Sequence, residues 1–403
     1  MYRLIAKLAW NNAFLRRART LLVIIMIAVS MSMMLSLQGI YDGMVLNMVD
    51  KTKRSDSGDI SIFHPGYRLN KVLQNSIKGA DAIKRYLDER EDVEAVAMRF
   101  SVEGLSSTAR KSSFSSIIGI DLDEEERFGA FSKFLKEGTV TFEHNGALIG
   151  VELAKTLKVK IGSKIIFSTQ DSSGEINAVA VKVRGIVQTT NIVLDATALY
   201  VERSRVQSFL GVGQDEATQI AVRTASPTLS TMLKHKYRSL DVKSFLELNP
   251  MLKMMQEMMV IFNSITFGIV MMVVFIGILG VMYVSILDRI REFGIMRGIG
   301  MQYRLIRLQI MLEALFVGFI GYLSGAVLGV SALLYLQQYG LDLSAWAEGL
   351  ESFGYDAVIY AHMEPSYFTN TFFAIIAASL LSVLLPLRKI KRLNPIDVIK
   401  AET

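Results

Sequence analysis

The sequence predicts an α-helical membrane protein with four transmembrane helices and a large α+β extracytoplasmic domain inserted between the first and second spans. Two observations lead to this fold class. First, the 403 residues are 51% hydrophobic and only 20% charged, against roughly 25% charged in soluble domains. Second, four stretches contain no Asp, Glu, Lys or Arg, namely residues 20–41, 258–287, 314–341 and 365–387. The bilayer therefore has to be considered as a solvent for this chain.

Each charge-free stretch is long enough to span a membrane. They contain 22, 30, 28 and 23 residues, and a helix needs about 20 apolar residues to cross roughly 30 Å of hydrocarbon. The first stretch follows Arg16, Arg17 and Arg19, so a cleaved signal peptide is the alternative there. A signal core has only about 7 to 15 apolar residues and a small-residue cleavage site. The first stretch is longer and lacks such a site, which favours a membrane anchor.

The distribution of basic residues predicts the orientation. Outside residues 47–258, the Lys and Arg residues form three groups of five: Arg3, Lys7, Arg16, Arg17, Arg19; Arg289, Arg291, Arg297, Arg304, Arg307; and Arg388, Lys389, Lys391, Arg392, Lys400. Basic residues beside spans favour the cytoplasm. We therefore expect the N-terminal segment 1–19, the loop 288–307 and the tail 388–403 to be cytoplasmic. The acidic loop 342–364 is expected outside, and topology explains the net charge of +6 without nucleic acid.

The long segment 47–250 is predicted to be a folded α+β domain. Short β-rich runs occur at 59–63, 115–120, 164–168 and 179–187, and they alternate with helical patterns at 80–90 and 152–158. Asp171 to Gly174 have the composition of a hairpin turn. With no cysteine in the chain, the domain must be stable without disulfides, as its size allows.

The helices beside this domain are predicted to be longer than a bilayer requires. No proline interrupts the helical pattern between Pro250 and Arg289, and about 37 residues would extend roughly 55 Å. We assign residues 20–46 to the first span with its stalk and 251–287 to the second. The alternative is that the extra turns lie in the interface. Residues 308–341 and 365–387 form the third and fourth spans.

Catalytic motifs are absent from the sequence. The four histidines are far apart, and no H-E-x-x-H, G-x-S-x-G or G-x-x-x-x-G-K-[ST] pattern occurs. The chain is therefore expected to be a non-catalytic membrane subunit that binds no metal or cofactor. If it performs work with ATP, a second chain must hydrolyse the nucleotide.

The segment 288–300 has the form of a short amphipathic helix. Ile290, Phe293, Ile295 and Met296 can share an apolar side, while Arg289, Arg291, Glu292 and Arg297 are expected to remain solvated. Gly298 and Gly300 allow a turn into the next span. The alternative is a solvated loop that only follows the charge rule.

The order of residues in this segment resembles the MacB/FtsX-like family of ABC transporter permeases, which includes the LolC/LolE lipoprotein-releasing permeases. Similarity extends to residues 8–21, 147–162 and 386–402, and thus over nearly the whole chain. The resemblance implies a bacterial inner-membrane complex of two permease chains, identical or paralogous, with a cytoplasmic ATPase that holds ATP and Mg. It also implies that a coupling helix docks on the ATPase through Arg289, Arg291, Glu292, Gly294, Ile295, Arg297 and Gly300.

The resemblance leaves three functions open. One is extraction or export of a lipoprotein or other hydrophobic substrate, and a second is MacB-like peptide or drug efflux. The third is FtsX-like activation of a cell-wall hydrolase without transport, although the outside domain is larger than expected for that branch. Capture of a periplasmic lipoprotein carrier is in doubt, because the hairpin 168–179 is short and lacks the proline-containing hook of the carrier-binding permease.

Two further features concern the third span. Gly321, Gly325 and Gly329 recur every four residues and form a smooth helix face, for packing within the chain or at a dimer seam. Glu313 lies near the cytoplasmic end of this span, where a carboxylate is costly in lipid. It is either an intramembrane functional residue or an interfacial one paired with Arg304 or Arg307.

Overall fold

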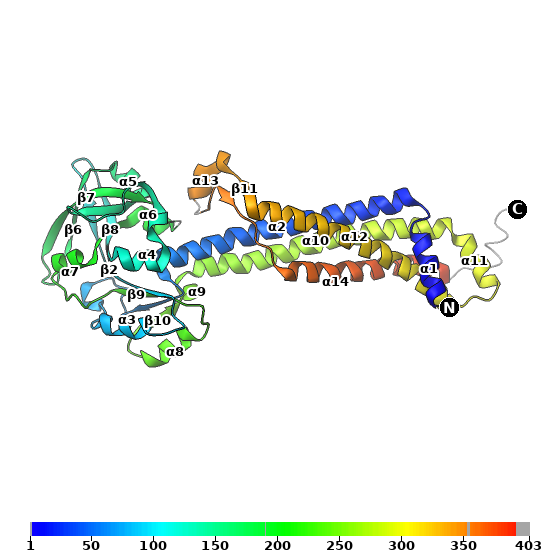
Figure 1. The fold of residues 1–403 in the computed structure, drawn as a ribbon, viewed down its shortest axis with the longest axis horizontal. Coiled ribbons are helices and arrows are strands. Elements are labelled where there is room, and N and C mark those ends of the chain that lie inside the picture. The colour runs from blue at the N-terminus through cyan, green and yellow to red at the C-terminus, as the bar shows by residue number, and fades with distance from the viewer. Residues whose placement is uncertain (1, 190, 353–354, 392–403) are drawn as a thin grey trace. The chain divides into compact units, whose positions relative to one another are not determined.

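The computed structural model describes residues 2–189, 191–352 and 355–391. The chain divides into two compact units. We call residues 1–45, 256–344 and 358–403 the helical unit, and residues 46–255 with 345–357 the sheet unit. Figure 1 labels the elements of both. Residues 392–403, most of the expected cytoplasmic tail, lie outside the described part of the chain.

Four long helices dominate the helical unit, and each is long and apolar enough to cross a membrane. They are α2 (Arg17–Thr52), α10 (Pro250–Asp288), α12 (Tyr303–Tyr339) and α14 (Pro365–Ser382). Each of the four charge-free stretches falls mainly within one of them, so the expected helices are confirmed. The short elements are α1 (Tyr2–Ala13), α11 (Ile290–Gly298), α15 (Leu384–Lys391), β11 (Leu341–Asp342) and β12 (Val358–Ile359).

The lengths of α2 and α10 agree with the expectation of extended helices. Helix α2 runs without a break to Thr52, and α10 contains 39 residues, which corresponds to about 58 Å of helix. The expected last span differs, because α14 ends at Ser382 and α15 begins at Leu384. Pro386 explains the interruption, since its ring nitrogen cannot donate to the carbonyl one turn earlier.

The core of the helical unit is formed by side chains from all four long helices. Buried members include Ile27, Met31, Val274, Ile310 and Ile375. Helix α1 packs against α12, where the rings of Trp10 and Phe316 lie 5.3 Å apart. The Thr20 hydroxyl donates to the Ala13 carbonyl at 2.6 Å and thereby closes the turn between α1 and α2.

The sheet unit is built on one mixed sheet in the order β10-β1-β9-β2-β3-β8-β5-β7-β4, with β6 paired to β2 and β7. Most pairs are antiparallel, while β3 with β8 and β5 with β7 are parallel. The strands are β1 (Ile60–Phe63), β2 (Ala95–Ser107), β3 (Ser112–Ile120), β4 (Leu135–Gly138), β5 (Gly146–Gly150), β6 (Lys164–Gln170), β7 (Ile176–Val187), β8 (Ala198–Glu202), β9 (Gln219–Arg223) and β10 (Asp241–Ser244).

The sheet unit also contains short helices, and its apolar core falls into separate clusters. One cluster lies around Ile62, Leu87 and Val222, and a second around Phe100, Leu153 and Phe167. The helices are α3 (Ala80–Asp88), α4 (Leu122–Gly129), α5 (Val151–Leu157), α6 (Ile192–Thr197), α7 (Arg203–Leu210), α8 (Leu229–Lys236), α9 (Phe245–Leu248) and α13 (Ala347–Ser352), with a π-helical turn η1 (Lys53–Ser57) and 3-10 turns at Leu73–Asn75, Phe131–Phe134 and Ser344–Trp346.

Most local expectations for this segment are confirmed. The helices expected at 80–90 and 152–158 are α3 and α5, and the hairpin turn between β6 and β7 is closed by the Asp171 carboxylate, which accepts from the Ser173 and Glu175 amides. The acidic loop 342–364 is not a simple connection between two spans. Its residues 345–357 belong to the sheet unit, where Lys51 and Asn47 donate to the Asp356 carboxylate at 2.5 and 2.7 Å.

Candidate functional site: a buried ion pair beside helix α11

Helix α11 begins after Arg289 and ends before a turn at Gly300, whose φ of +92° favours glycine. Phe293 is fully buried, as its expected place on an apolar side requires. The expected position of Ile295 on the same apolar side is corrected, because 49% of this residue is exposed. Two residues of helix correspond to a rotation of about 200°, so Ile295 points away from the side that buries Phe293.

The environment of Arg289 also differs from the expected solvated position. Only 9% of the residue is exposed. Its Nη1 donates to both carboxylate oxygens of Glu313 at 3.1 and 3.2 Å, and its Nε donates to Glu292 at 3.0 Å. The guanidinium also lies 5.2 Å from the centre of the Phe293 ring. These contacts neutralise and cover the charge, which explains why it can be buried.

Glu313 has a different partner from the two that the sequence suggested. It is 2% exposed and pairs with Arg289, whereas Arg304 and Arg307 are exposed. The turn after α11 brings the end of α10 beside α12, so the partner lies 24 residues away in sequence. Gln309 donates a further hydrogen bond to Glu313 at 3.3 Å, one turn earlier on α12.

A cavity of about 320 Å³ adjoins this ion pair. It lies where α1, α2, α10 and α12 meet, and Asn12 and Thr20 contribute to its lining. Its charged residues balance, with Arg16, Arg19 and Arg289 against Asp288, Glu292 and Glu313. Asp288 pairs with Arg16 and, at 2.8 Å, with Arg19. Because its charges balance, we interpret this cluster as a contact that joins the helices.

The remaining residues expected at this helix lie on both of its sides. Gly294 is buried, Arg297 is partly buried, and Arg291 and Gly300 are exposed. The Glu292 side chain is 56% exposed even though it contacts Arg289. Ile299, just beyond the helix, is 80% exposed. Helix α11 therefore has a buried side that holds the ion pair and an outer side with two exposed isoleucines.

The three glycines of the third span pack within the chain. A side-chain carbon on Gly321 would lie 2.9 Å from Ile27, one on Gly325 would lie 2.8 Å from Met31, and one on Gly329 would lie 2.6 Å from Leu35. All three neighbours are on α2, and all three glycines are buried. The glycine face therefore allows α2 and α12 to approach closely, which is the first of the two alternatives.

Across the described residues, no group of three His, Cys, Asp or Glu could hold a metal ion. The sequence signalled α11 but missed the Arg289–Glu313 pair. The signal that could have revealed this pair is Arg289, the one residue between the apolar helix α10 and the amphipathic helix α11.

Four membrane-length helices, a sheet unit between the first two in chain order and a short charged helix after the second define a multi-pass membrane protein of the permease class. Residues 20–240 match the MacB-like periplasmic core domain, and residues 264–395 match the FtsX-like permease C-terminal domain. Because the first match covers more than half of the sequence, the chain belongs to the MacB/FtsX-like family of ABC transporter permeases.

Individual relatives are distant. The lipoprotein-releasing system transmembrane protein LolE of Haemophilus influenzae is 24% identical over 344 residues, which cover 79% of this chain and 80% of LolE. The macrolide export ATP-binding/permease protein MacB 2 of Aeromonas hydrophila is 24% identical across 100% of this chain, which spans only 61% of that relative. The solved periplasmic region of MacB from Actinobacillus actinomycetemcomitans aligns with a TM-score of 0.34 at 16% identity, covering 48% of this chain and 92% of that structure.

Proposed function

We propose that this chain is the permease subunit of an ATP-driven transporter in the bacterial inner membrane. Both termini and α11 lie in the cytoplasm, and the sheet unit lies outside, inserted between the first and second spans. A partner ATPase binds ATP with Mg and docks on α11, and a second permease chain, identical or paralogous, completes the complex. The observation that carries this proposal is the outer side of α11, where Ile295 and Ile299 are 49% and 80% exposed.

Mechanical coupling follows from how α11 is held. Its inner side is joined to α12 by the Arg289–Glu313 pair, and its start follows directly on the end of α10. A partner that moves α11 therefore acts on two long helices at once. Helix α10 contains proline only at its first position, so no interior proline weakens it as a transmitting rod.

For the substrate, we infer a lipoprotein or another hydrophobic molecule that is taken from the outer leaflet or the periplasm. The match to LolE over most of both chains supports this class. A second candidate is efflux of a peptide or drug, which is supported by the match to MacB 2 along the entire chain. The short turn between β6 and β7 contains no proline, so capture of a lipoprotein carrier by this chain is not part of the proposal.

The docking role is tested by replacing exposed isoleucine with aspartate. Ile295→Asp with Ile299→Asp should abolish co-purification of the ATPase, because truncating or charging the centre of an interface removes most of its affinity. Ile176→Asp is the matched control, since Ile176 is 85% exposed on the sheet unit. Retention of the ATPase by the double variant at the control's level would refute docking on α11.

The topology is tested by labelling single cysteines, which the cysteine-free chain makes simple. In spheroplasts, Ser172→Cys should react with a membrane-impermeant maleimide, whereas Gln302→Cys should react only after lysis. Both positions are exposed, so burial does not prevent labelling. Reaction of Gln302→Cys in intact spheroplasts would overturn the orientation.

A further inference from the structure

The sheet unit contains a cavity of about 490 Å³ that the proposed function does not use, within the roughly 300–1,000 Å³ typical of small-molecule sites. Strands β2, β3 and β8 contribute to its wall through Ser101, Ile118 and Tyr200. Residues 55–57 of η1, just after α2, also line it, as do residues 248–249, just before α10. The residues that directly follow α2 and directly precede α10 in the chain therefore border this cavity.

Two buried hydroxyl groups in the wall lack a hydrogen-bond partner. Tyr200 and Ser55 are each 3% exposed. Among the described residues, neither the Tyr200 Oη nor the Ser55 Oγ finds a donor or acceptor. Leaving such a group unpaired costs about 1–3 kcal/mol, and native proteins rarely tolerate it without a reason. Both residues line the cavity, which makes a molecule bound there a candidate partner for these groups.

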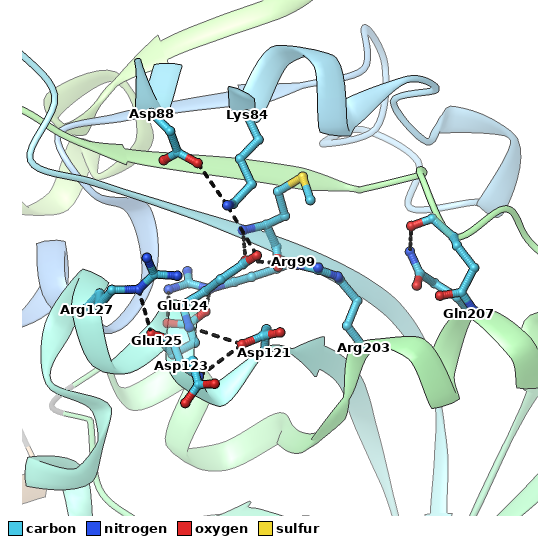
Figure 2. Close-up of polar contacts among 12 residues, drawn as sticks. Lys84, Asp88, Arg99, Asp121, Asp123, Glu124, Glu125, Arg127, Arg203 and Gln207 are labelled. Carbon is cyan, nitrogen blue, oxygen red and sulfur yellow. Dashed lines mark hydrogen bonds and ion pairs between the residues drawn. The ribbon is translucent and has the colours of Figure 1, made fainter. Parts of the chain in front are cut away.

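The charged groups beside the cavity are not all matched by close partners. Arg99 is 4% exposed, and both its Nε and Nη2 donate to Glu125, at 2.5 and 2.8 Å, so this pair is already neutral (Figure 2). The Asp56 carboxylate lies 3.8 Å from the same guanidinium, which it shares with Glu125, and it accepts a hydrogen bond from the Asn191 amide at 3.3 Å. Burial raises the pKa of the Asp56 carboxyl above its ordinary value, although Arg99 and Lys71 act to lower it.

The other basic side chains near Arg99 also form ion pairs. Arg203 and Lys84 pair with Glu124 at 2.9 and 3.5 Å, which ties α4 to α7 and α3 (Figure 2). Lys71 donates to Glu103 at 2.7 Å. Asp56 therefore gives the interior of the cavity one unmatched negative charge.

Arg68 gives the cavity a positive charge at a different place. It lines the cavity and is exposed, in contrast to the buried Arg99. A molecule that complements both ends must carry a cation inside, near Asp56, and an anion near Arg68. Between them, the free hydroxyls of Tyr200 and Ser55 can bond to carbonyl groups.

We propose that this cavity binds a small zwitterion with a primary ammonium group, of the chemical class of short peptides. The ammonium pairs with Asp56, the ligand carboxylate faces Arg68, and the two unpartnered hydroxyls bond to peptide carbonyls. Since the cavity borders η1 and residues 248–249, the bound ligand contacts the residues that follow α2 and those that precede α10. This inference goes beyond the proposed transport function and does not depend on ATPase docking.

Calorimetric titration of the purified full chain in lipid nanodiscs tests the proposal with three probes. Tri-alanine should bind, and tri-alanine amide, which keeps the ammonium group, should bind more weakly. N-acetyl-tri-alanine should lose about tenfold or more in affinity, because it lacks the charge that pairs with Asp56. Failure of all three probes to bind, or equal binding of the acetylated and free peptides, would overturn the proposal.

Variants locate the binding. Asp56→Asn should weaken tri-alanine binding about tenfold or more, whereas Asp81→Asn, on the exposed start of α3, should not change it. Tyr200→Phe keeps the ring and removes only the free hydroxyl, so it should weaken binding even if Asp56→Asn affects folding. Arg68→Gln should weaken binding of the free acid and leave the amide unchanged. Unaltered binding in Tyr200→Phe and Asp56→Asn together would place the peptide elsewhere.

Discussion

The helical and sheet units each bury an arginine against a glutamate, but the two surroundings differ. In the helical unit, Arg289 and Glu313 are 9% and 2% exposed, and the charges around the adjoining cavity balance. In the sheet unit, Arg99 and Glu125 are 4% and 1% exposed, and Asp56 adds a further negative charge. We interpret the cluster without net charge as a contact that holds helices together. The cluster with one excess negative charge lies beside a cavity and is a candidate ligand site.

The largest expected effect comes from breaking either pair. Glu313→Gln and Glu125→Gln each remove the buried counter-charge of a buried arginine, and breaking a buried pair in this way costs up to about 3–5 kcal/mol. Reversible unfolding in mixed detergent micelles should show lower stability for both variants. A loss below about 1 kcal/mol in either one, the size of an exposed pair, would mean that the pair is solvated.

Replacing both charged residues of each pair with apolar residues should affect the stability of the two clusters differently. Arg289→Met with Glu313→Leu removes both charges from a balanced site, and such replacements are often neutral or stabilising. Arg99→Met with Glu125→Leu removes the cation closest to Asp56 and also removes the bond from Arg99 to the Asp56 carbonyl. The first double variant should therefore unfold near the wild-type denaturant concentration and the second well below it. If both double variants unfolded at the same denaturant concentration, the two clusters would not differ in their charge balance.

Close packing of α12 on α2 depends on the glycine face of α12. Gly321→Ala places a carbon against Ile27, a β-branched side chain with little freedom to move, and should cost about 1–3 kcal/mol. Gly280→Ala, with no atom within 4 Å, should be neutral or stabilise α10 by up to about 1 kcal/mol. Denaturation of the two variants side by side checks this, and equal stabilities would contradict the intrachain glycine face.

The smallest effect concerns Asp56 and pH. Because its folded pKa is raised, the native state holds this proton more tightly than the unfolded chain does. Stability should therefore decrease as pH rises from its ordinary pKa of about 3.9 through the raised value. Asp56→Asn should remove this component and stabilise the ligand-free protein at neutral pH, as measured by thermal unfolding from pH 4 to 8. A variant less stable than wild type at pH 7 would show that Asp56 is satisfied without a ligand.

The sequence supported the long helices and the local elements because these depend on neighbouring residues. Apolar runs and the absence of proline predicted α2 and α10 nearly to their ends, and Asp171 marked a real turn. The sites depend on contacts between distant residues. Arg289 meets Glu313, and Arg99 meets Asp56, only after helices and strands pack together. Which side of α11 is buried likewise depends on tertiary packing, so the sequence alone placed Ile295 on the same side as Phe293, although only Phe293 is buried.

We propose that the Arg289–Glu313 pair transmits movement of α11 to α10 and α12. Spin labels at Gln302→Cys and Ser172→Cys in one chain, reconstituted with the partner ATPase, test this role. Electron–electron distance measurements should show a shift between the ATP-bound and nucleotide-free states. With Arg289→Met and Glu313→Leu, the ATPase should still bind and the shift should be lost. An equal ATP-dependent shift with and without the ion pair would contradict the account.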